Sequence, residues 1–263
     1  MKKILTRGYL AVLLLLLYAP VLLLSVYSFT DSTMIGSIHG FSIRNYQVLF
    51  SREELLQMIF GTLILAATVA LLSGILGTLG AIGAFYSRKK QKTVMDIMNN
   101  IPVVNADVVT GFSICLLTVV FLGINKSSYI PMIVGLTALC VPFVYLSVMP
   151  RLKQLDGQIF EAALDLGCTP TQTMVKVVIP QLVPGIVSGM MLSVTLVLDD
   201  YFITTYTKPA TFDTISTYVV NATKGAQTEI KTALWALSTV IFVCVLLIAV
   251  GNNIIAGKRE KSA

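Results

Sequence analysis

The sequence predicts an all-α integral membrane protein with six transmembrane helices and both termini in the cytoplasm. Of its 263 residues, 56% are hydrophobic and only 12% are charged, and its mean hydropathy is +0.83. A soluble domain of this length would not be so apolar. The apolar residues gather into runs of about 20, the length that a helix needs to cross a bilayer. The sequence lacks the alternation of short strands and turns that predicts a β-barrel.

Six segments have the length and composition of a span. They cover residues 8–29, 58–86, 101–122, 129–149, 182–205 and 233–256. The first segment follows a basic N-terminal stretch, as in a signal peptide, but it is long enough to span and no small-residue cleavage site follows it. We therefore interpret it as an uncleaved first span. The second segment carries Gly74, Gly77, Gly80 and Gly83, and this ridge of small residues predicts close packing against other helices.

The positive charges predict the orientation of these spans. With the N-terminus inside, thirteen of the 19 Lys and Arg residues fall in inner segments, at residues 2–7, 88–92, 151–176 and 258–261. Lys and Arg concentrate in cytoplasmic loops, so both termini are expected on the cytoplasmic side. This role also accounts for the net charge of +6. The sequence lacks the combination of clustered basic residues and interleaved aromatic residues that would indicate nucleic-acid binding.

The sequence carries no motif of an enzyme or of a metal site. It lacks a P-loop, a nucleophile elbow and a zinc-protease motif. The cysteines lack the spacing of metal ligands, and the single histidine, His39, lies in a predicted outer loop. We therefore expect no catalytic residue, no metal and no cofactor in this chain. If it moves a solute uphill, the energy must come from an ion gradient or from a partner.

The longest inner connection, residues 156–181, is more polar than its surroundings and predicts two short helices. Asp156 is a suitable N-cap for the first helix, and Gly167 is a suitable residue to end it. One face of this helix is expected to be apolar and small, because its members follow the helical repeat. These members are Ile159, Ala162, Ala163 and Leu166.

The second helix of this connection has its own start motif. Thr169 is a predicted N-cap, Pro170 fits the first helical position, and Gln172 completes a capping box. This helix is expected to run towards Pro180. Two short helices with a sharp bend would form a rigid cytoplasmic protrusion that fits a partner's cleft.

The same residues carry a family resemblance. The stretch EAALDLGCTPTQTMVKVVIP resembles the EAA loop of type I ABC importer permeases, whose pattern is EAA, three residues, G, nine residues, I, one residue, L and P. The matching positions here are Glu161, Ala162, Ala163, Gly167, Val177, Ile179 and Pro180. Val177 and Ile179 are conservative departures from the pattern. The resemblance implies that this loop is the coupling helix that docks on the ATP-hydrolysing subunit.

Further stretches extend the resemblance over most of the chain. GFSIRNYQVLF, LSVMPRLKQLD and VLDDYFITTYTKPA resemble the second permease subunit of spermidine/putrescine importers, the PotC-type permeases. Permeases for ferric ion, thiamine, sulfate or phosphonate share the fold and some of these patterns, and they remain the alternative. The resemblance implies one polytopic domain over residues 1–263, with the permease core at 58–256 and the cytoplasmic EAA coupling loop at 156–181.

Acidic side chains inside spans are costly and therefore mark candidate functional sites. Here they are Asp107 in the third span and Asp199 and Asp200 near the outer end of the fifth. Three carboxylates suit a polyammonium substrate, and Tyr201, with Phe202 and Trp235, could add cation–π contacts. The structural alternatives are a helix cap for Asp107, together with Asn105, where a helix restarts after Pro102, and a solvated helix end for the Asp pair. Adjacent helical residues point about 100° apart, so one of the pair is expected to face the pathway.

The sequence thus predicts a non-catalytic permease subunit in a bacterial cell membrane that carries polyamines by alternating access. The resemblance implies a second permease as heterodimer, two copies of an ATPase and an extracytoplasmic binding protein, with lipid around the spans. Two other classes stay open. A secondary transporter would need an ion-coupling site and, in many folds, internal repeats, whereas a membrane scaffold would need no acids inside its spans.

Overall fold

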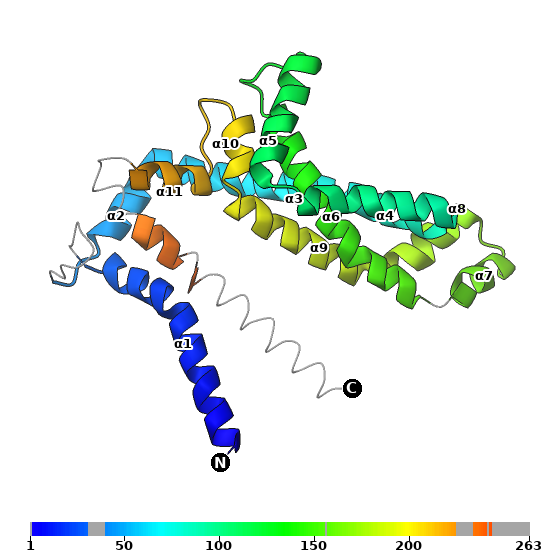
Figure 1. Cartoon of the computed structure of the whole chain (residues 1–263), viewed down its shortest axis with the longest axis horizontal. Helices are drawn as coiled ribbons and strands as arrows, with labels where there is room; N and C mark the ends of the chain where they lie inside the picture. Colours follow the sequence, from blue (N-terminus) through cyan, green and yellow to red (C-terminus); the bar gives the residue numbers. More distant parts are fainter. Residues whose placement is uncertain (1, 31–39, 156, 225–233, 241, 244–263) are drawn as a thin grey trace. The chain divides into compact units, whose positions relative to one another are not determined.

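The computed structural model describes residues 2–30, 40–155, 157–224, 234–240 and 242–243. Several expectations lie outside these residues: the cap at Asp156, the loop histidine His39, the basic C-terminal cluster and most of the predicted sixth span. The described chain is helical, and its elements are shown in Figure 1. In chain order they are α1 (Lys2–Ser28), α2 (Arg44–Ser51), α3 (Glu53–Tyr86), α4 (Lys89–Val104), α5 (Asp107–Cys115), the π-helix η1 (Leu116–Phe121), α6 (Ile130–Gln154), α7 (Gly157–Asp165), α8 (Pro170–Thr173), the π-helix η2 (Met174–Val178), α9 (Ile179–Asp199), α10 (Phe202–Thr207) and α11 (Ile215–Lys224).

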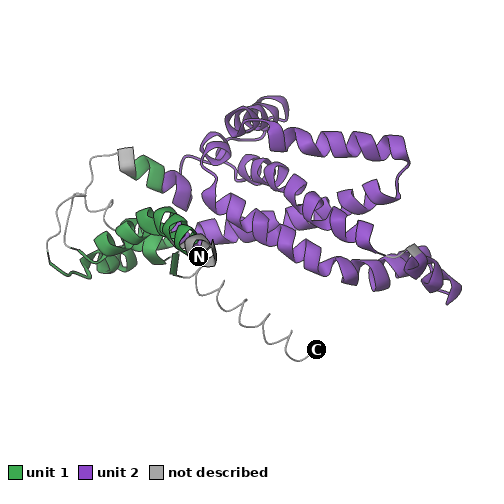
Figure 2. Cartoon of the chain, turned by 60° about the horizontal axis from the view of Figure 1, so that its bottom comes forward, with its two compact units in different colours: residues 1–57, 219–263 green, residues 58–218 purple. Residues whose placement is uncertain are grey.

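The chain divides into two compact units (Figure 2), residues 1–57 with 219–263 and residues 58–218. In the first unit, the side-chain amide of Asn45 joins α2 to the end of α1. Its Nδ2 donates to the carbonyl oxygens of Ser28 at 3.0 Å and Thr30 at 3.1 Å. These bonds satisfy two carbonyls at and just beyond the end of α1, where the helix itself supplies no partner.

The second unit is built on α3, α6 and α9, whose apolar faces form two clusters of buried side chains. One cluster centres on Val69, Leu136 and Val197, and the other on Val144, Val148 and Leu182. Glycines permit the close approach of these helices. A Cβ atom added at Gly77 would lie 2.7 Å from Val144 Cβ, and one at Gly189 would lie 2.9 Å from Val144 Cα. Such contacts are typical of helix packing in membranes.

The close packing predicted for the glycine ridge of α3 is therefore confirmed in part. Gly74 and Gly77 are in close contact, since a Cβ atom at Gly74 would meet Met190 Cγ at 2.9 Å. At Gly80 and Gly83 an added Cβ atom would make contacts of 3.8 and 3.9 Å, which is ordinary van der Waals distance. The half of the ridge nearer the N-terminus of α3 is thus the one that packs closely.

Four described helices are long and apolar enough to cross a membrane: Gly8–Ser28, Glu53–Tyr86, Ile130–Gln154 and Pro170–Asp199. A fifth span results if the bent pair of α4 and the α5–η1 helix counts as one. The two parts of this pair meet at an angle of 104°. The third predicted span, residues 101–122, is therefore not one straight helix.

The bend lies a few residues after the proline. Pro102 lies inside α4, and the chain leaves the helix at Asn105 and Ala106, whose ψ angles are 146° and 134°. The fifth predicted span also differs from the structure. Its helix ends at Asp199 instead of residue 205, and α10 begins after a short extended break.

Candidate functional site

The three predicted pathway acids come together in one cavity of the second unit. The cavity has a volume of about 400 Å³, and Asp107, Asp199, Asp200 and Tyr201 all line it. The apolar part of its wall comes from Pro102, Val103, Leu139, Phe143, Leu196 and Phe202. Asp107 and the Asp pair are more than 90 residues apart in the sequence, so only the fold brings them together.

Two helix breaks meet at this cavity. The first separates α4 from α5 and is followed directly by Asp107, and the second separates α9 from α10 and contains Asp200 and Tyr201. Leu139 and Phe143 come from the middle of α6, so the cavity lies beside the centre of that span and not at its outer end. Non-helical backbone at such depth is tolerated where it is buried in protein or lines a water-filled cavity.

The two neighbouring acids of the second break have different surroundings. Asp200 is only 8% exposed. Its carboxylate accepts hydrogen bonds from the backbone N–H groups of Ile203, at 3.4 Å, and Thr204, at 2.7 Å, and from the Thr204 hydroxyl, at 2.7 Å. Asp200 thus satisfies the first N–H groups of α10, and these bonds occupy a large part of its capacity to accept.

Asp199 and Asp107 are exposed to the cavity instead. Among the described residues, neither carboxylate accepts a hydrogen bond or forms an ion pair, although the backbone oxygen of Asp199 accepts from the Ser216 hydroxyl at 3.1 Å. The expected cap by Asp107 or Asn105 is not formed. Ala106 occupies the N-cap of α5 without a side-chain bond, and Asp107 lies in the first turn, where a negative charge is favourable. Both carboxylates remain available to a cationic ligand.

The aromatic residues predicted beside the acids lie in different places. Tyr201 and Phe202 both line the cavity and make an edge-on contact, with ring centroids 5.3 Å apart. Trp235 belongs to the other unit, where its ring lies 5.7 Å from that of Tyr27. The cation–π contacts proposed for these rings stay a prediction.

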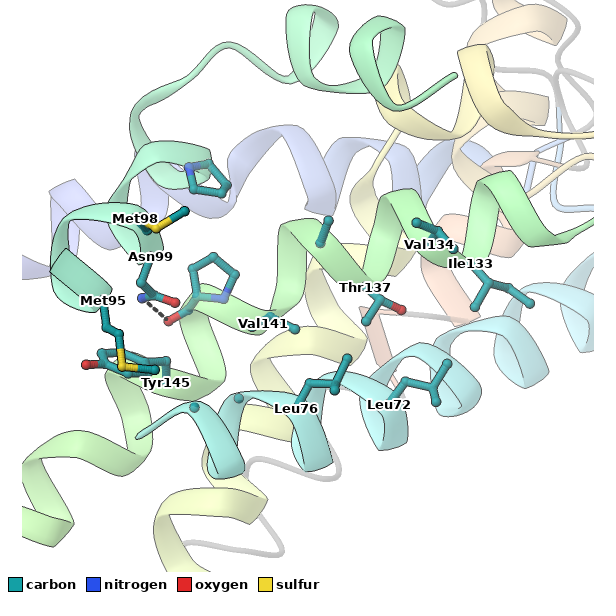
Figure 3. A pocket seen from close by; sticks show the side chains of 15 residues that line it. Leu72, Leu76, Met95, Met98, Asn99, Ile133, Val134, Thr137, Val141 and Tyr145 are labelled. Carbon is teal, nitrogen blue, oxygen red and sulfur yellow. Dashed lines mark hydrogen bonds between the residues drawn. The ribbon is translucent and has the colours of Figure 1, made fainter. Parts of the chain in front are cut away.

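A polar seam joining α4 to α6 was not predicted from the sequence. Asn99 Nδ2 donates to the Pro142 carbonyl at 3.5 Å, and the Tyr145 hydroxyl donates to the Asp96 carboxylate. Figure 3 shows Asn99 and Tyr145 on the wall of an apolar cavity of about 630 Å³ between α3, α4 and α6. The signal that could have indicated this contact is the pair of polar residues Asp96 and Asn99 in α4, since polar side chains that become buried need hydrogen-bond partners.

The predicted coupling residues lie mainly on α7. Glu161, Ala162 and Ala163 belong to this helix, and Gly167 ends it with φ of +85°. Gly167 N donates to Leu164 O at 2.8 Å and Cys168 N to Ala163 O at 3.1 Å. This pair of bonds is a Schellman motif, which needs a left-handed residue at the position of Gly167. The predicted end of the first helix is confirmed.

The apolar face predicted for α7 is divided between the protein and solvent. Ala163 is buried, whereas Ile159, Ala162 and Leu166 are exposed, with Leu166 at 86%. Phe160 packs on the second unit's core, and its ring lies 5.7 Å from that of Tyr86 at the end of α3. α7 therefore contacts a long span on one side and presents small and apolar side chains on the other.

The capping box is also confirmed, but its helix does not end at Pro180. Gln172 N donates to Thr169 Oγ1 at 3.3 Å, and Thr169 N donates to Gln172 Oε1 at 3.1 Å. The helix then continues through η2 into α9 as one 30-residue segment. A π turn therefore lies directly before Pro180, the position where a proline would disturb a regular α-helix. The connection therefore contains one short helix and the start of a span.

Comparisons with known proteins agree with this arrangement. The family described as "Binding-protein-dependent transport system inner membrane component" matches residues 77–260. The spermidine/putrescine transport system permease protein PotC of Escherichia coli (strain K12) is 27% identical over 260 residues, which cover 98% of this chain and 96% of PotC. The putrescine transport system permease protein PotI of the same strain is 32% identical over 234 residues, which cover 86% of this chain and 81% of PotI.

The fold also occurs in solved structures. One chain of a bacterial alginate ABC transporter, crystallised in complex with an alginate pentasaccharide-bound periplasmic protein, superposes with a TM-score of 0.71. The alignment covers 95% of both chains at 18% sequence identity. At this identity the likeness concerns the fold alone.

Proposed function

Because this chain belongs to the family of binding-protein-dependent transport system inner membrane components and is a PotC-like permease of the type I ABC importer class, we propose that it imports polyamines. It would form half of the translocation pathway for putrescine or spermidine. The observation that carries the proposal is the cavity in which Asp107 and Asp199 present unpaired carboxylates beside the middle of α6.

The charge of this cavity favours a cationic substrate. Carboxylates inside a membrane protein are costly unless they are paired or hydrated, and a polyammonium guest supplies the missing partner. The rings of Tyr201 and Phe202 add surfaces that attract cations. Sulfate and phosphonate, which are anions, would be repelled by the same groups.

In the proposed alternating-access mechanism, the two carboxylates belong to different helices that move relative to each other. Asp107 begins α5 and Asp199 ends α9, so relative movement of these helices changes the distance between the two charges. We infer that a polyamine bridges them in one state of the transporter and is released when they move apart. ATP-driven movement of a partner would reach the spans through α7, by way of the contact between Phe160 and Tyr86.

The proposal extends to the assembly. The chain would pair with a second permease, two copies of an ATPase and an extracytoplasmic binding protein, with ATP hydrolysed by the ATPase alone. Ile159, Ala162, Leu166 and the neighbouring Glu161 would form the surface that docks on the ATPase. The membrane would be the bacterial cell membrane, crossed by six spans of one polytopic domain over 1–263, with a permease core at 58–256 and both termini in the cytoplasm.

Uptake by the reconstituted complex tests the substrate. Proteoliposomes that hold the wild-type complex and its binding protein should accumulate labelled putrescine or spermidine when ATP is supplied to the ATPase side. Unlabelled thiamine, sulfate, phosphonate and ferric ion, each at equal concentration, should not compete. Uptake of one of these solutes in labelled form, with no uptake of polyamine, would assign that solute as the substrate instead.

The orientation has its own test in intact cells. A cysteine introduced in place of Thr211, between α10 and α11, should react with a membrane-impermeant maleimide added from outside. A cysteine in place of Lys89 or Gln154, at the predicted cytoplasmic ends of α4 and α6, should not react until the cells are opened. Labelling of the Lys89→Cys variant in intact cells would reverse the proposed topology.

A further inference from the structure

The last two turns of α4, with the residue that follows them, line a groove that the proposed transport site does not include. The groove has a volume of about 580 Å³ and is lined by Ile97, Asn100, Ile101, Val104 and Asn105. Both asparagines are exposed. The groove therefore combines three apolar side chains with two amides, on the side of α4 that does not bind α6.

Each of the two amides is held by a hydrogen bond of its NH2 group. Asn100 Nδ2 donates to the Asp96 carbonyl at 2.8 Å, and Asn105 Nδ2 donates to Thr110 Oγ1 at 3.0 Å. Because the NH2 end of each amide is fixed to the protein, its other end, the carbonyl oxygen, is left as an acceptor. Among the described residues, neither Oδ1 accepts a hydrogen bond. The groove thus offers oriented acceptors.

The depth of these oxygens restricts what can cover them. The neighbouring Asn99 donates to the carbonyl of Pro142, which lies close to the middle of the 25-residue helix α6. Asn100 is therefore at about the mid-level of that span. A carbonyl oxygen that faced hydrocarbon at this level would lack a donor, at a cost that membrane proteins avoid. Water, a ligand or a protein surface must meet this side of α4.

The groove is next to the acid cavity along the chain. Pro102 and Val103, from the same turn of α4, line the acid cavity, and Asp107 follows Asn105 by two residues. A ligand that leaves the carboxylate of Asp107 therefore finds the oxygen of Asn105 as a neighbouring acceptor. This placement favours a continuous route over two unrelated sites.

We propose that Asn100 and Asn105 form an uncharged subsite for an alkyl diammonium group on the polyamine route. The proposal rests on the function proposed above. The two amide oxygens accept hydrogen bonds from ammonium groups, while Ile97, Ile101 and Val104 contact the methylene chain between them. Five residues of helix correspond to a rise of about 7.5 Å, the length scale of a short alkyl diamine. Neutral oxygens bind an ammonium more weakly than carboxylates do, which suits a step from which the substrate must leave.

Uptake kinetics of the reconstituted complex, with putrescine as the probe, test this subsite. Asn100→Leu and Asn105→Leu keep roughly the side-chain volume and remove the acceptor, and each should raise the KM for putrescine at least about fivefold. Asn100→Asp and Asn105→Asp restore an acceptor and add charge, so they should return the KM to the wild-type value or below it while lowering kcat. A merely structural role would not give opposite effects on KM for the two kinds of substitution.

Thr93→Val is the matched control, since Thr93 is exposed on α4 outside the groove and its hydroxyl bonds to the Lys89 carbonyl of its own helix. Its KM should stay at the wild-type value. Unchanged KM in both leucine variants, while wild-type complex transports putrescine, would overturn the subsite and leave the proposed function intact. Failure of either leucine variant to co-purify with the second permease would also overturn it, by placing Asn100 or Asn105 in a subunit interface. Absence of transport by the wild type would remove the proposed function and this inference together.

Discussion

The Tyr145 hydroxyl on α6 donates a hydrogen bond to the Asp96 carboxylate on α4, and Tyr145 is only 4% exposed. Together with the bond from Asn99 to Pro142, this contact joins the first half of the bent α4–α5 pair to the long helix α6. Pro102 and Val103 of the same helix line the acid cavity, so loss of these two bonds is expected to affect one of its walls.

Removal of this hydroxyl should loosen α4. Tyr145→Phe keeps the ring and deletes the donor, and a hydrogen bond to a charged group contributes about 1.5–3 kcal/mol. We expect a lower apparent Tm of the purified complex and a several-fold lower rate of polyamine uptake, measured at equal membrane levels. Tyr206→Phe is the control, because the Tyr206 hydroxyl makes no hydrogen bond among the described residues and its ring contact with Phe112 would be kept. Equal effects of the two substitutions would contradict the role of the contact.

The unpaired carboxylates should matter for transport through their charge. Asp107→Asn and Asp199→Asn preserve volume and remove the charge, and each is expected to reduce polyamine uptake about tenfold or more, since the lost interaction of about 1.5 kcal/mol or more corresponds to that factor in occupancy. Asp199→Glu should retain more activity than Asp199→Asn. Initial uptake rates at matched expression provide the measurement, and wild-type uptake by the Asp107→Asn/Asp199→Asn double variant would exclude both acids from the route.

Asp200 should instead behave as a structural residue. Asp200→Ala leaves the N–H groups of Ile203 and Thr204 and the Thr204 hydroxyl without their shared acceptor, and we expect destabilisation of at least about 2 kcal/mol. The thermal stability of the detergent-purified complex should fall for Asp200→Ala and stay unchanged for Asp199→Ala. A stable Asp200→Ala complex that fails only in uptake would assign this residue to the substrate route instead.

The end of α7 should decide how well the chain binds the ATPase. Gly167 has φ of +85°, a conformation that costs a residue with a Cβ atom about 1 kcal/mol or more. Gly167→Val is therefore expected to fray α7 and weaken co-purification of the ATPase, and Glu161→Lys should weaken it through charge while α7 stays folded. Insertion of the chain in the membrane should be unaffected. Gly8→Val is a suitable control, because an added Cβ atom there meets nothing within 4 Å; full ATPase binding by Gly167→Val would contradict the proposed docking surface.

Local sequence patterns determined much of this protein. The capping box at Thr169 and Gln172, the helix end at Gly167 and the long apolar helices all follow from residues within a few positions of one another, and the structure confirms them. Backbone N–H and carbonyl groups at a helix end need partners nearby, so the residues that supply them lie close in the sequence. The acids Asp107, Asp199 and Asp200 could also be identified from the sequence, because a carboxylate inside an apolar segment is rare.

Tertiary structure alone decided the surroundings of these acids. Asp199 and Asp200 are adjacent and chemically identical, and only the start of α10 makes one a hydrogen-bonded structural group and leaves the other exposed. The helix before Asp107, α4, is bonded to α6 through residues that are 43 and 49 positions apart in the sequence. The helix likewise continues through Pro180, after the π turn η2. Such outcomes depend on which helices pack together, and that packing is a balance of many weak contacts over the whole unit that no short stretch of sequence contains.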